Sequence, residues 1–268
     1  MADRPRVQRV EALVLKHNDW GEADRILLLY TRQLGKERAV AKGVRKISSR
    51  KAGHLEPFTE ASLLLAKGHD LDIVTQAETL RVYPGLAGDL TRLGQAAYLA
   101  ELVDRFTNEG EANPALYRLL AECLEQVAES ADTFAALRSF ELHLLDLSGF
   151  RPELFHCVRC GAEIQAQDQF FSLNQGGVLC PDCGPRVLDA RPVSVDALRY
   201  LRHLARNTPQ KGMHTKIPGR VRPELENLLA ADIAYLAERR LNALRFLDEV
   251  RGEGKAVSPP AKPPSRVE

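Results

Sequence analysis

The sequence predicts an α+β multidomain protein, with an N-terminal five-stranded β-barrel followed by an α-helical bundle that carries an inserted four-cysteine module. Short alternating runs fill the first 80 residues, a helical period follows, and two Cys-x-x-Cys pairs interrupt that period. The chain of 268 residues also exceeds the usual size of one domain. We expect a barrel over residues 1–82, a helical domain built from 83–150 and 190–250, a metal module over 151–189 and a disordered tail over 251–268.

Five strand-like runs make up the predicted barrel. They cover residues 9–15, 25–30, 38–42, 60–65 and 73–79, with turn clusters at 17–22 and 67–70. No helical stretch between them is long enough for a crossover connection, so a small barrel is expected in place of a parallel sheet. The alternation fits an OB-like barrel and an SH3-like barrel equally well.

The apolar period becomes helical after residue 85. Asn113 can cap a helix whose first residue is Pro114, because proline at that position loses no hydrogen bond. Gly149 can end a later helix in the left-handed conformation, and Ser194 is a plausible N-cap. The tail has four prolines and no aromatic residue, so it lacks the apolar surface that would offset ordering entropy. The helices are expected over residues 90–106, 114–128, 133–147, 195–205 and 224–250.

Four cysteines occur in two pairs with metal-ligand spacing. Each pair encloses two residues and is followed by glycine, which can supply the positive φ of a tight turn. The alternating segment between the pairs predicts a hairpin, so the region is typical of a zinc ribbon with one structural Zn²⁺ per chain. Four thiolates leave no open coordination position, so this ion would fold a module without performing chemistry. The predicted ligands are Cys157, Cys160, Cys180 and Cys183.

Disulfides, an iron-sulfur centre and unliganded thiols are the alternatives at these cysteines. The spacing and a reducing compartment favour zinc. His156 precedes the first pair and is expected at the surface, not as a ligand. Cys123 lies in an apolar helical context and is expected to be a buried small hydrophobe.

The net charge of +1 hides two basic stretches and one acidic region. Residues 36–51 carry seven Lys or Arg against one acid, residues 191–222 carry eight against one, and residues 94–132 carry two against eight. A solvated charged surface is the alternative for each. The first stretch is predicted to bind phosphates through Lys36, Arg38, Lys42, Arg45, Lys46, Arg50 and Lys51. The second stretch is a candidate DNA or partner site with Arg199, Arg202, Arg206, Lys211, Lys216, Arg220 and Arg222.

Aromatic residues of the barrel are candidate platforms for stacked bases. Each of them is nevertheless expected to lie in the core. The four candidates are Trp20, Tyr30, Phe58 and Tyr83.

The sequence has no motif that indicates an enzyme. The phosphate-binding loops Gly-x-x-x-x-Gly-Lys-Ser/Thr and Gly-x-Gly-x-x-Gly are absent, as is the nucleophile motif Gly-x-Ser-x-Gly. A zinc deaminase is rejected because His54 lies in an apparent strand and two further thiols complete the coordination. No apolar run approaches the roughly 18 residues that cross a bilayer, and the N-terminus does not read as a secretory signal. We expect a non-enzymatic cytoplasmic protein with no membrane partner.

Several motifs together resemble one known family. They include Ala12-Leu-Val-Leu with Glu22-Ala-Asp24-Arg-Ile, residues 31–35, Ala41-Lys42-Gly43-Val-Arg45-Lys46, Leu55-Glu-Pro57-Phe58, Gly149-Phe-Arg-Pro152 before the first cysteine pair, and the helix that begins near Ser194. These motifs cover most of the chain, which in this combination resembles the bacterial RecO family of recombinational DNA repair proteins.

The resemblance implies an N-terminal OB fold that binds DNA, a helical domain and a zinc module inserted in it. It further implies a mediator that binds single- and double-stranded DNA, anneals complementary strands, and works with RecR and single-strand-binding protein to load RecA at the nucleoid. On this view the second basic stretch extends the DNA path or receives the acidic tail of single-strand-binding protein, and the acidic region offers a docking face for RecR. The alternative function is a zinc-ribbon interaction protein of RNA or transcription complexes.

Overall fold

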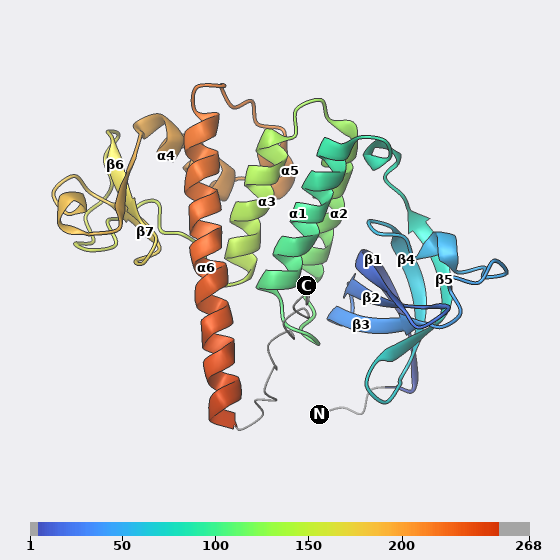
Figure 1. Ribbon diagram of the computed structural model, residues 1–268. Coiled ribbons are helices and arrows are strands. Elements are labelled where there is room, and N and C mark those ends of the chain that lie inside the picture. The colour runs from blue at the N-terminus through green and yellow to red at the C-terminus, as the bar shows by residue number, and fades with distance from the viewer. Residues whose placement is uncertain (1–4, 252–268) are drawn as a thin grey trace, which may run out of the picture.

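The computed structural model describes the backbone of residues 5–251 and the side chains of residues 5–238. A β-barrel, a helical bundle and a small cysteine module follow one another across the molecule (Figure 1). The tail predicted over residues 251–268 lies outside the described residues, apart from Arg251 at the end of the last helix. Within the described part of the chain, no helix has both the length and the apolar character needed to span a membrane.

The barrel consists of the five predicted strands. They pair in the order β1-β2-β3-β5-β4, and β4 pairs with β1 again. Every ladder is antiparallel except the one between β3 and β5, which is parallel and contains two residue pairs. This topology confirms the N-terminal five-stranded OB-like barrel. The strands are β1 (Val7–Trp20), β2 (Asp24–Thr31), β3 (Gly35–Ala41), β4 (Glu60–Ala66) and β5 (Asp72–Arg81).

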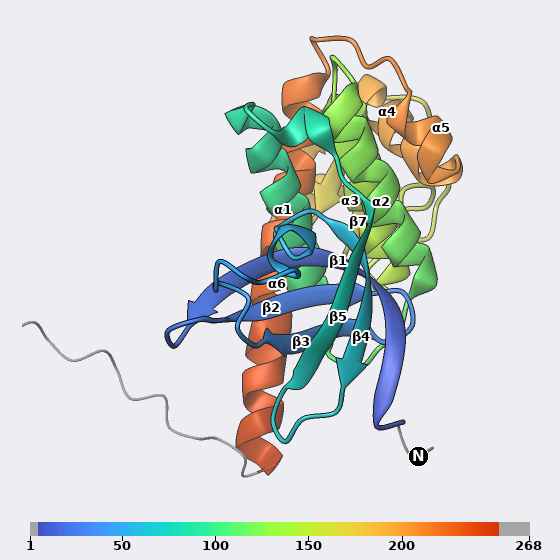
Figure 2. The ribbon, with the colours of Figure 1, turned by 90° about the vertical axis from the view of Figure 1, so that its right-hand side faces the viewer.

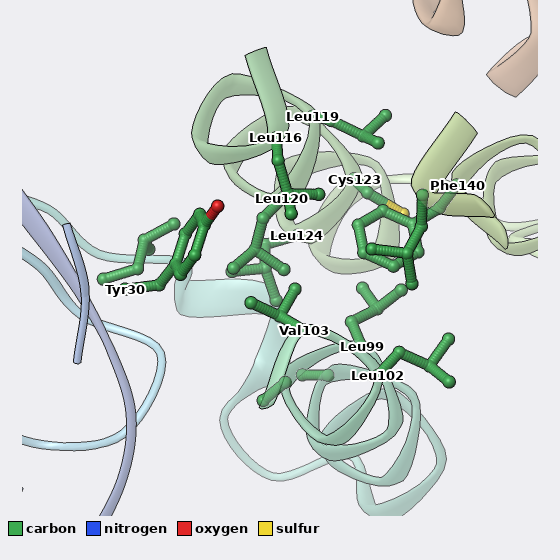
Figure 3. Packing of buried hydrophobic residues seen from close by; sticks show 14 of the residues in the cluster. Tyr30, Leu99, Leu102, Val103, Leu116, Leu119, Leu120, Cys123, Leu124 and Phe140 are labelled. Carbon is green, nitrogen blue, oxygen red and sulfur yellow. The ribbon is translucent and has the colours of Figure 1, made fainter. Parts of the chain in front are cut away.

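The first two strands are buried on both faces. Ala12 and Val14 belong to the core inside the barrel, whereas Leu13 of the same strand packs in the core of the helices. Tyr30 of β2 also faces the helices, and Figure 3 shows its ring directed toward leucines of the bundle. Burial on both faces explains why these strands carry nearly continuous apolar runs in place of strict alternation.

Two local predictions for the barrel are wrong. β1 continues to Trp20, so the turn predicted over 17–22 is confined to the few residues before β2, where Gly21 has a φ of +56°. His54 lies in the 3-10 helix η1 (Ala52–His54), not in a strand. The polar residues before Trp20 resemble a turn, but pairing with β2 holds them extended.

The helices were predicted at nearly the observed positions. Asn113 caps α2, because its Oδ1 accepts a hydrogen bond from the Leu116 N–H at 3.1 Å. Ser194 caps α4 through a 3.1 Å bond from the Ala197 N–H, and Gly149 follows α3 with a φ of +80°. The short helix α5 was not predicted. The helices are α1 (Leu90–Phe106), α2 (Pro114–Glu129), α3 (Phe134–Leu147), α4 (Val195–Arg206), α5 (Pro209–Met213) and α6 (Arg222–Arg251).

The cysteine module is an insertion in the helical bundle. α3, which precedes the module, packs against α4, α5 and α6, which follow it. The module contains a sheet in the order β7-β6-β8, built from β6 (Gln169–Ser172), β7 (Gly177–Leu179) and β8 (Ala190–Val193). The hairpin β6–β7 was predicted, whereas β8 is a third strand that lies beyond residue 189. Figures 1 and 2 place the barrel against the α1–α2 side of the bundle, and Figure 1 shows the module on the far side, beyond α6.

Several polar contacts join the barrel to the bundle, and those of Lys36 and Tyr117 are the most buried. Lys36 of β3 donates hydrogen bonds to the carbonyl oxygen of Asp104 at 2.6 Å and to its carboxylate at 3.2 Å. The Tyr117 hydroxyl of α2 donates to the Glu60 carboxylate of β4 at 2.9 Å. Burial opposes the charge on Asp104, but the ammonium groups of Lys36 and Lys16 outweigh it and lower the pKa of that carboxyl.

Candidate metal centre and nucleic-acid interface

The four cysteines converge on one point of the inserted module. Their Sγ atoms all lie within 4.8 Å of one another, and those of Cys160 and Cys180 are 3.8 Å apart. A tetrahedron of thiolates with zinc–sulfur bonds of about 2.3 Å has edges of about 3.8 Å, so the donor set fits Zn²⁺ in both chemistry and spacing. Among the described residues, no other group of His, Cys, Asp or Glu side chains forms a comparable cluster.

The glycines after the two cysteine pairs have different roles. Gly161 has a φ of +76°, as predicted for a knuckle turn, and its N–H donates to the Cys157 carbonyl at 2.8 Å. Gly184 does not have a positive φ. A Cβ at Gly184 would lie 2.2 Å from the Phe170 ring, so this glycine is required for close packing against β6.

Two thiols of the cluster have pKa values shifted in opposite directions. Burial alone would raise the pKa of Cys157, but hydrogen bonds from the backbone N–H groups of Cys180, Cys160 and Arg159 outweigh it and lower that pKa to about 6. Burial and hydrogen bonding with the neighbouring thiols raise the pKa of Cys183 to about 12. Ionisation is therefore favoured at Cys157 and opposed at Cys183, and a divalent cation at the centre would stabilise the thiolates.

The two other residues considered with the cluster lie outside it. His156 is exposed, and its Nδ1 lies 3.8 Å from the Glu153 carboxylate. Cys123 is fully buried in the core of the bundle, where its thiol lies 3.6 Å from the Ala136 carbonyl. Burial raises the pKa of Cys123, so this thiol behaves as the predicted small hydrophobe.

The loop over residues 42–51, which we call the basic loop, presents four exposed cations at one end of the barrel, of which Arg45 is bound to neighbouring residues. It begins with two successive turns, closed by bonds from the Lys46 N–H to the Gly43 carbonyl and from the Ser49 N–H to the Lys46 carbonyl. Gly43 has a φ of +65°, which the first turn requires. Lys42, Lys46 and Arg50 are exposed, and none of these three has an ion pair or side-chain hydrogen bond within the described residues.

The turn between β1 and β2 holds the basic loop in place. The Asp24 carboxylate accepts a 2.7 Å bond from the Gly43 N–H, and the Arg45 N–H donates to the Ala23 carbonyl at 2.9 Å. The Arg45 guanidinium also donates to the Gly21 carbonyl at 3.3 Å and pairs with Asp19 at 3.3 Å. Arg45 thus fastens the loop, and no motif in the sequence indicated that Asp19 and Asp24 would anchor it.

Three other residues of the first basic stretch lie apart from these exposed cations. Lys36 is only 12% exposed and is bound to Asp104, as described above. Lys51 turns inward and donates to the Val74 carbonyl at 2.8 Å, and burial lowers its pKa. Arg38 is exposed on β3 but lines a hollow together with Asp104 and Glu109.

The second basic stretch does not form one continuous patch. Arg202 attaches the cysteine module to α4 by donating to the carbonyl oxygens of Leu154 at 2.8 Å and Ile164 at 3.4 Å. Arg206 stacks on the Phe155 ring at 4.0 Å. The two arginines at the end of the stretch are paired with acids, Arg220 with Asp196 and Arg222 with Asp132. Of the seven candidate residues, Arg199, Lys211 and Lys216 are exposed and have no acidic partner among the described residues, and Arg199 lies 6.0 Å from the centroid of the Tyr200 ring.

Carboxylates of the acidic region are largely engaged within the molecule. Asp104 binds Lys36 and Lys16, and Asp132 binds Arg222. Glu101 and Glu125 pair with Arg105 and Arg81, and Glu122 accepts hydrogen bonds from Gln210. Much of this charge therefore contributes to internal contacts and is less available to a partner.

The four aromatic residues considered as stacking platforms differ in how far their side chains are exposed. Tyr30 and Tyr83 are buried, and Phe58 packs against the helical core with a φ of +63°. Trp20 is 62% exposed, so the expectation that it lies in the core is wrong. It is the last residue of β1, directly before the turn that holds the basic loop.

Comparison with known proteins agrees with this architecture. The family model "Recombination protein O N terminal" matches residues 6–83, which contain the barrel. The model "Recombination protein O C terminal" matches residues 87–245, which contain the helices and the cysteine module. Together the two models span nearly all of the described chain.

Relatives named "DNA repair protein RecO" match almost end to end. The protein of Roseiflexus sp. (strain RS-1) is 41% identical over 256 residues, which is 96% of this chain and 90% of that protein. The protein of Desulforamulus reducens is 37% identical over 245 residues, covering 91% of this chain and 95% of its own. A relative from Dehalococcoides mccartyi (strain ATCC BAA-2266 / KCTC 15142 / 195) is 35% identical, with 92% and 97% covered. With both halves of the chain matched in this way, the protein belongs to the RecO family of DNA repair proteins.

Proposed function

We propose that this protein is a non-enzymatic mediator of recombinational repair that binds single- and double-stranded DNA and anneals complementary strands. The observation that carries the proposal is the basic loop, whose exposed cations Lys42, Lys46 and Arg50 have no acidic partner within the described residues. Such cations can neutralise phosphates and release counterions without reading bases. A protein that acts on chromosomal DNA works in the cytoplasm at the nucleoid, and this location is part of the proposal.

Annealing needs no catalytic residue in this mechanism. Two DNA strands repel each other as polyanions, and a cationic surface that holds both lowers this repulsion. Base pairing then supplies the specificity. The role of the protein is to bring the strands together and release the duplex, so no bond is made or broken.

Zn²⁺ is the proposed structural cofactor, one per chain. Cys157, Cys160, Cys180 and Cys183 would hold it, and the ion would supply a fixed cross-link between the two knuckles and no reaction chemistry. The module docks on α4 through Arg202 and Phe155, so its fold also supports the surface of the bundle.

RecR and single-strand-binding protein are the proposed partners in loading RecA. Membership of the RecO family supports both. An acidic tail of single-strand-binding protein would meet the exposed cations of the second basic stretch, Arg199, Arg206, Lys211 and Lys216.

The test of DNA binding replaces Lys42, Lys46 and Arg50 together by Ala. Arg45 is left intact because it fastens the loop to the neighbouring turn. Binding of labelled single- and double-stranded oligonucleotides is measured by anisotropy at several salt concentrations. Affinity is expected to fall almost equally for all sequences, and the slope of log K against log salt to decrease by about 0.7 per lost contact on single strands and about 0.9 on duplexes.

A matched control removes the same charge from the bundle. The variant Arg199→Ala, Lys211→Ala, Lys216→Ala also loses three exposed cations, but they are spread over the second basic stretch. It should bind DNA with nearly the affinity of the unaltered protein. Equal losses in the two variants would mean that net charge, not the basic loop, controls binding, and an unchanged loop variant would remove the loop from the proposal.

A further inference from the structure

One large apolar side chain stands exposed at the end of the barrel that carries the basic loop. Trp20, the single tryptophan of the chain, is 62% exposed, although aromatic side chains of this size are usually largely buried. Tyr30 and Tyr83 are buried in the core, and Phe58 packs partly against it. Trp20 is therefore not part of a hydrophobic core among the described residues, and packing does not explain why an indole stands at this position.

Hydrogen bonds join the strand end that carries Trp20 to the basic loop. Trp20 is paired in register with Asp24, whose carboxylate accepts the Gly43 N–H at 2.7 Å. On the other side of Trp20, Asp19 pairs with Arg45 at 3.3 Å, and Arg45 also bonds to the carbonyls of the intervening turn. Trp20 thus lies in the chain between two residues that fix the loop, at the same end of the barrel as the exposed cations.

The basic loop itself carries a second exposed apolar side chain. Ile47 is fully exposed and directly follows Lys46. Ile47 belongs neither to the barrel core nor to the helical core. Exposed apolar groups interleaved with cations fit a ligand that combines flat apolar faces with an anionic backbone.

The acidic residues near Trp20 restrict where phosphates can lie. Asp19 is shared by Arg25 at 3.2 Å and Arg45 at 3.3 Å, so two guanidinium groups offset its charge. Asp24 is directed to the Gly43 backbone. Glu22 is exposed in the turn, and an anionic backbone is therefore favoured on the side of the basic loop.

We propose that Trp20 stacks on an unpaired base of single-stranded DNA whose phosphates lie on Lys42, Lys46 and Arg50, with Ile47 flanking the same strand. The inference rests on the proposed DNA binding at the basic loop and adds the group that distinguishes single strands from duplexes. Bases inside a duplex already cover each other's faces, so the indole gains little from them. An unpaired base has a free face, and its stacking on an aromatic ring is tolerant of sequence.

The single tryptophan makes the stacking directly observable. The full-length protein is titrated with a labelled oligothymidylate, with its duplex, and with an abasic strand of equal length that has the same phosphates without bases. Intrinsic fluorescence reports stacking on Trp20, and anisotropy of the label reports binding. We expect strong quenching with the oligothymidylate, and little quenching with the duplex or the abasic strand although both bind.

Variants separate stacking from a structural effect. Trp20→Ala should weaken binding of the oligothymidylate by about 5- to 100-fold and leave binding of the abasic strand unchanged, whereas Trp20→Phe should retain most of the affinity. Val82→Ala is the control, because Val82 is a similarly exposed apolar residue just beyond the end of β5. Thermal unfolding of each variant checks that the barrel is intact.

Two results would overturn the inference while leaving the proposed function standing. In the first, Trp20→Ala binds the oligothymidylate as tightly as the unaltered protein does. In the second, Trp20→Ala loses affinity equally for the oligothymidylate and the abasic strand, so the bases are not involved. Failure of the unaltered protein to bind any of the three nucleic acids would overturn both the inference and the proposed function.

Discussion

Two glycines beside β2 both have a positive φ, but only one of them lies close to another segment of the backbone. Gly21 before β2 has a φ of +56°, and a Cβ added there would meet nothing within 4 Å. Gly35 after β2 has a φ of +75°, and a Cβ would lie 1.9 Å from the Glu111 carbonyl oxygen. Gly35 is therefore a point where the barrel backbone touches the segment between α1 and α2.

Replacement of Gly35 by Ala is expected to destabilise the protein more than replacement of Gly21 by Ala. Both variants place a side chain in the left-handed region, at a cost of about 1–2 kcal/mol. Only Gly35→Ala must also displace backbone at the junction, which adds about 1–3 kcal/mol. Urea unfolding measures the difference, and equal midpoints for the two variants would show that the junction yields without cost.

A buried carboxyl in α6 predicts a dependence of stability on pH. Asp232 is 2% exposed, its Oδ1 has no hydrogen-bond partner within the described residues, and burial raises its pKa from 3.8 to about 7. Between these values the folded protein keeps a proton that the unfolded chain has lost, so this contribution to stability falls as the pH rises. The contribution of the protonated Asp232 to the free energy of unfolding is complete below about pH 4 and is lost above about pH 7.

The variant Asp232→Asn should remove that dependence, because the amide does not ionise. Relative to the unaltered protein, its stability should increase steadily between about pH 4 and pH 7 and then level off. Thermal unfolding across this range gives the difference between the two proteins. A difference that stays constant with pH would mean that Asp232 is not buried as a neutral acid.

At the scale of elements, the cysteine module is the part whose fold is expected to depend on the proposed Zn²⁺. Removal of one ligand at the surface, by Cys160→Ser, should abolish metal binding with little loss of packing, since Cys160 is exposed. Cys123→Ala is the matched control, because it removes the fifth cysteine from the bundle core and should leave the metal in place. Elemental analysis measures the metal content, and limited proteolysis of residues 151–193 shows whether the module is still folded.

The module is expected to become protease-sensitive in Cys160→Ser, because its small sheet has little core of its own. DNA binding by the barrel should persist, since the basic loop makes its anchoring contacts within the barrel. Fully reduced unaltered protein that contains much less than one equivalent of zinc would count against the site.

The elements that the sequence predicted well are those with a local cause. Short strand-like runs bounded by turn clusters placed the five strands, the helical period placed the long helices, and cap residues such as Asn113 and Ser194 fixed two helix starts. The cysteine spacing predicted the convergence of the four thiols. Each of these signals arises from neighbours a few residues apart, so a single sequence displays it.

The elements that were missed depend on distant partners or are too short to show a period. β8 contains Pro192 and exists because β6 pairs with it. α5 has five residues, fewer than two helical turns. Lys36 pairs with Asp104, which lies 68 positions away in the chain. The residues around Lys36 in the sequence therefore could not indicate that this lysine forms an internal ion pair.

Across the whole molecule, the arrangement of charge carries the functional account. The chain has 37 basic and 36 acidic side chains, and cations such as Lys36, Arg202 and Arg222 are held in internal contacts. Lys42, Lys46 and Arg50 lie in one loop and have no acidic partner within the described residues. A near-neutral protein can thus present a cationic surface at the barrel end, where phosphates of two strands can be neutralised.

Annealing of complementary oligonucleotides, naked and coated with single-strand-binding protein, tests this account most directly. The unaltered protein should pair the strands faster than buffer in both forms, and the variant Lys42→Ala, Lys46→Ala, Arg50→Ala should lose most of that acceleration at moderate salt while remaining folded. Annealing by the loop variant at the rate of the unaltered protein would contradict the claim that the exposed cations of the basic loop bring the strands together.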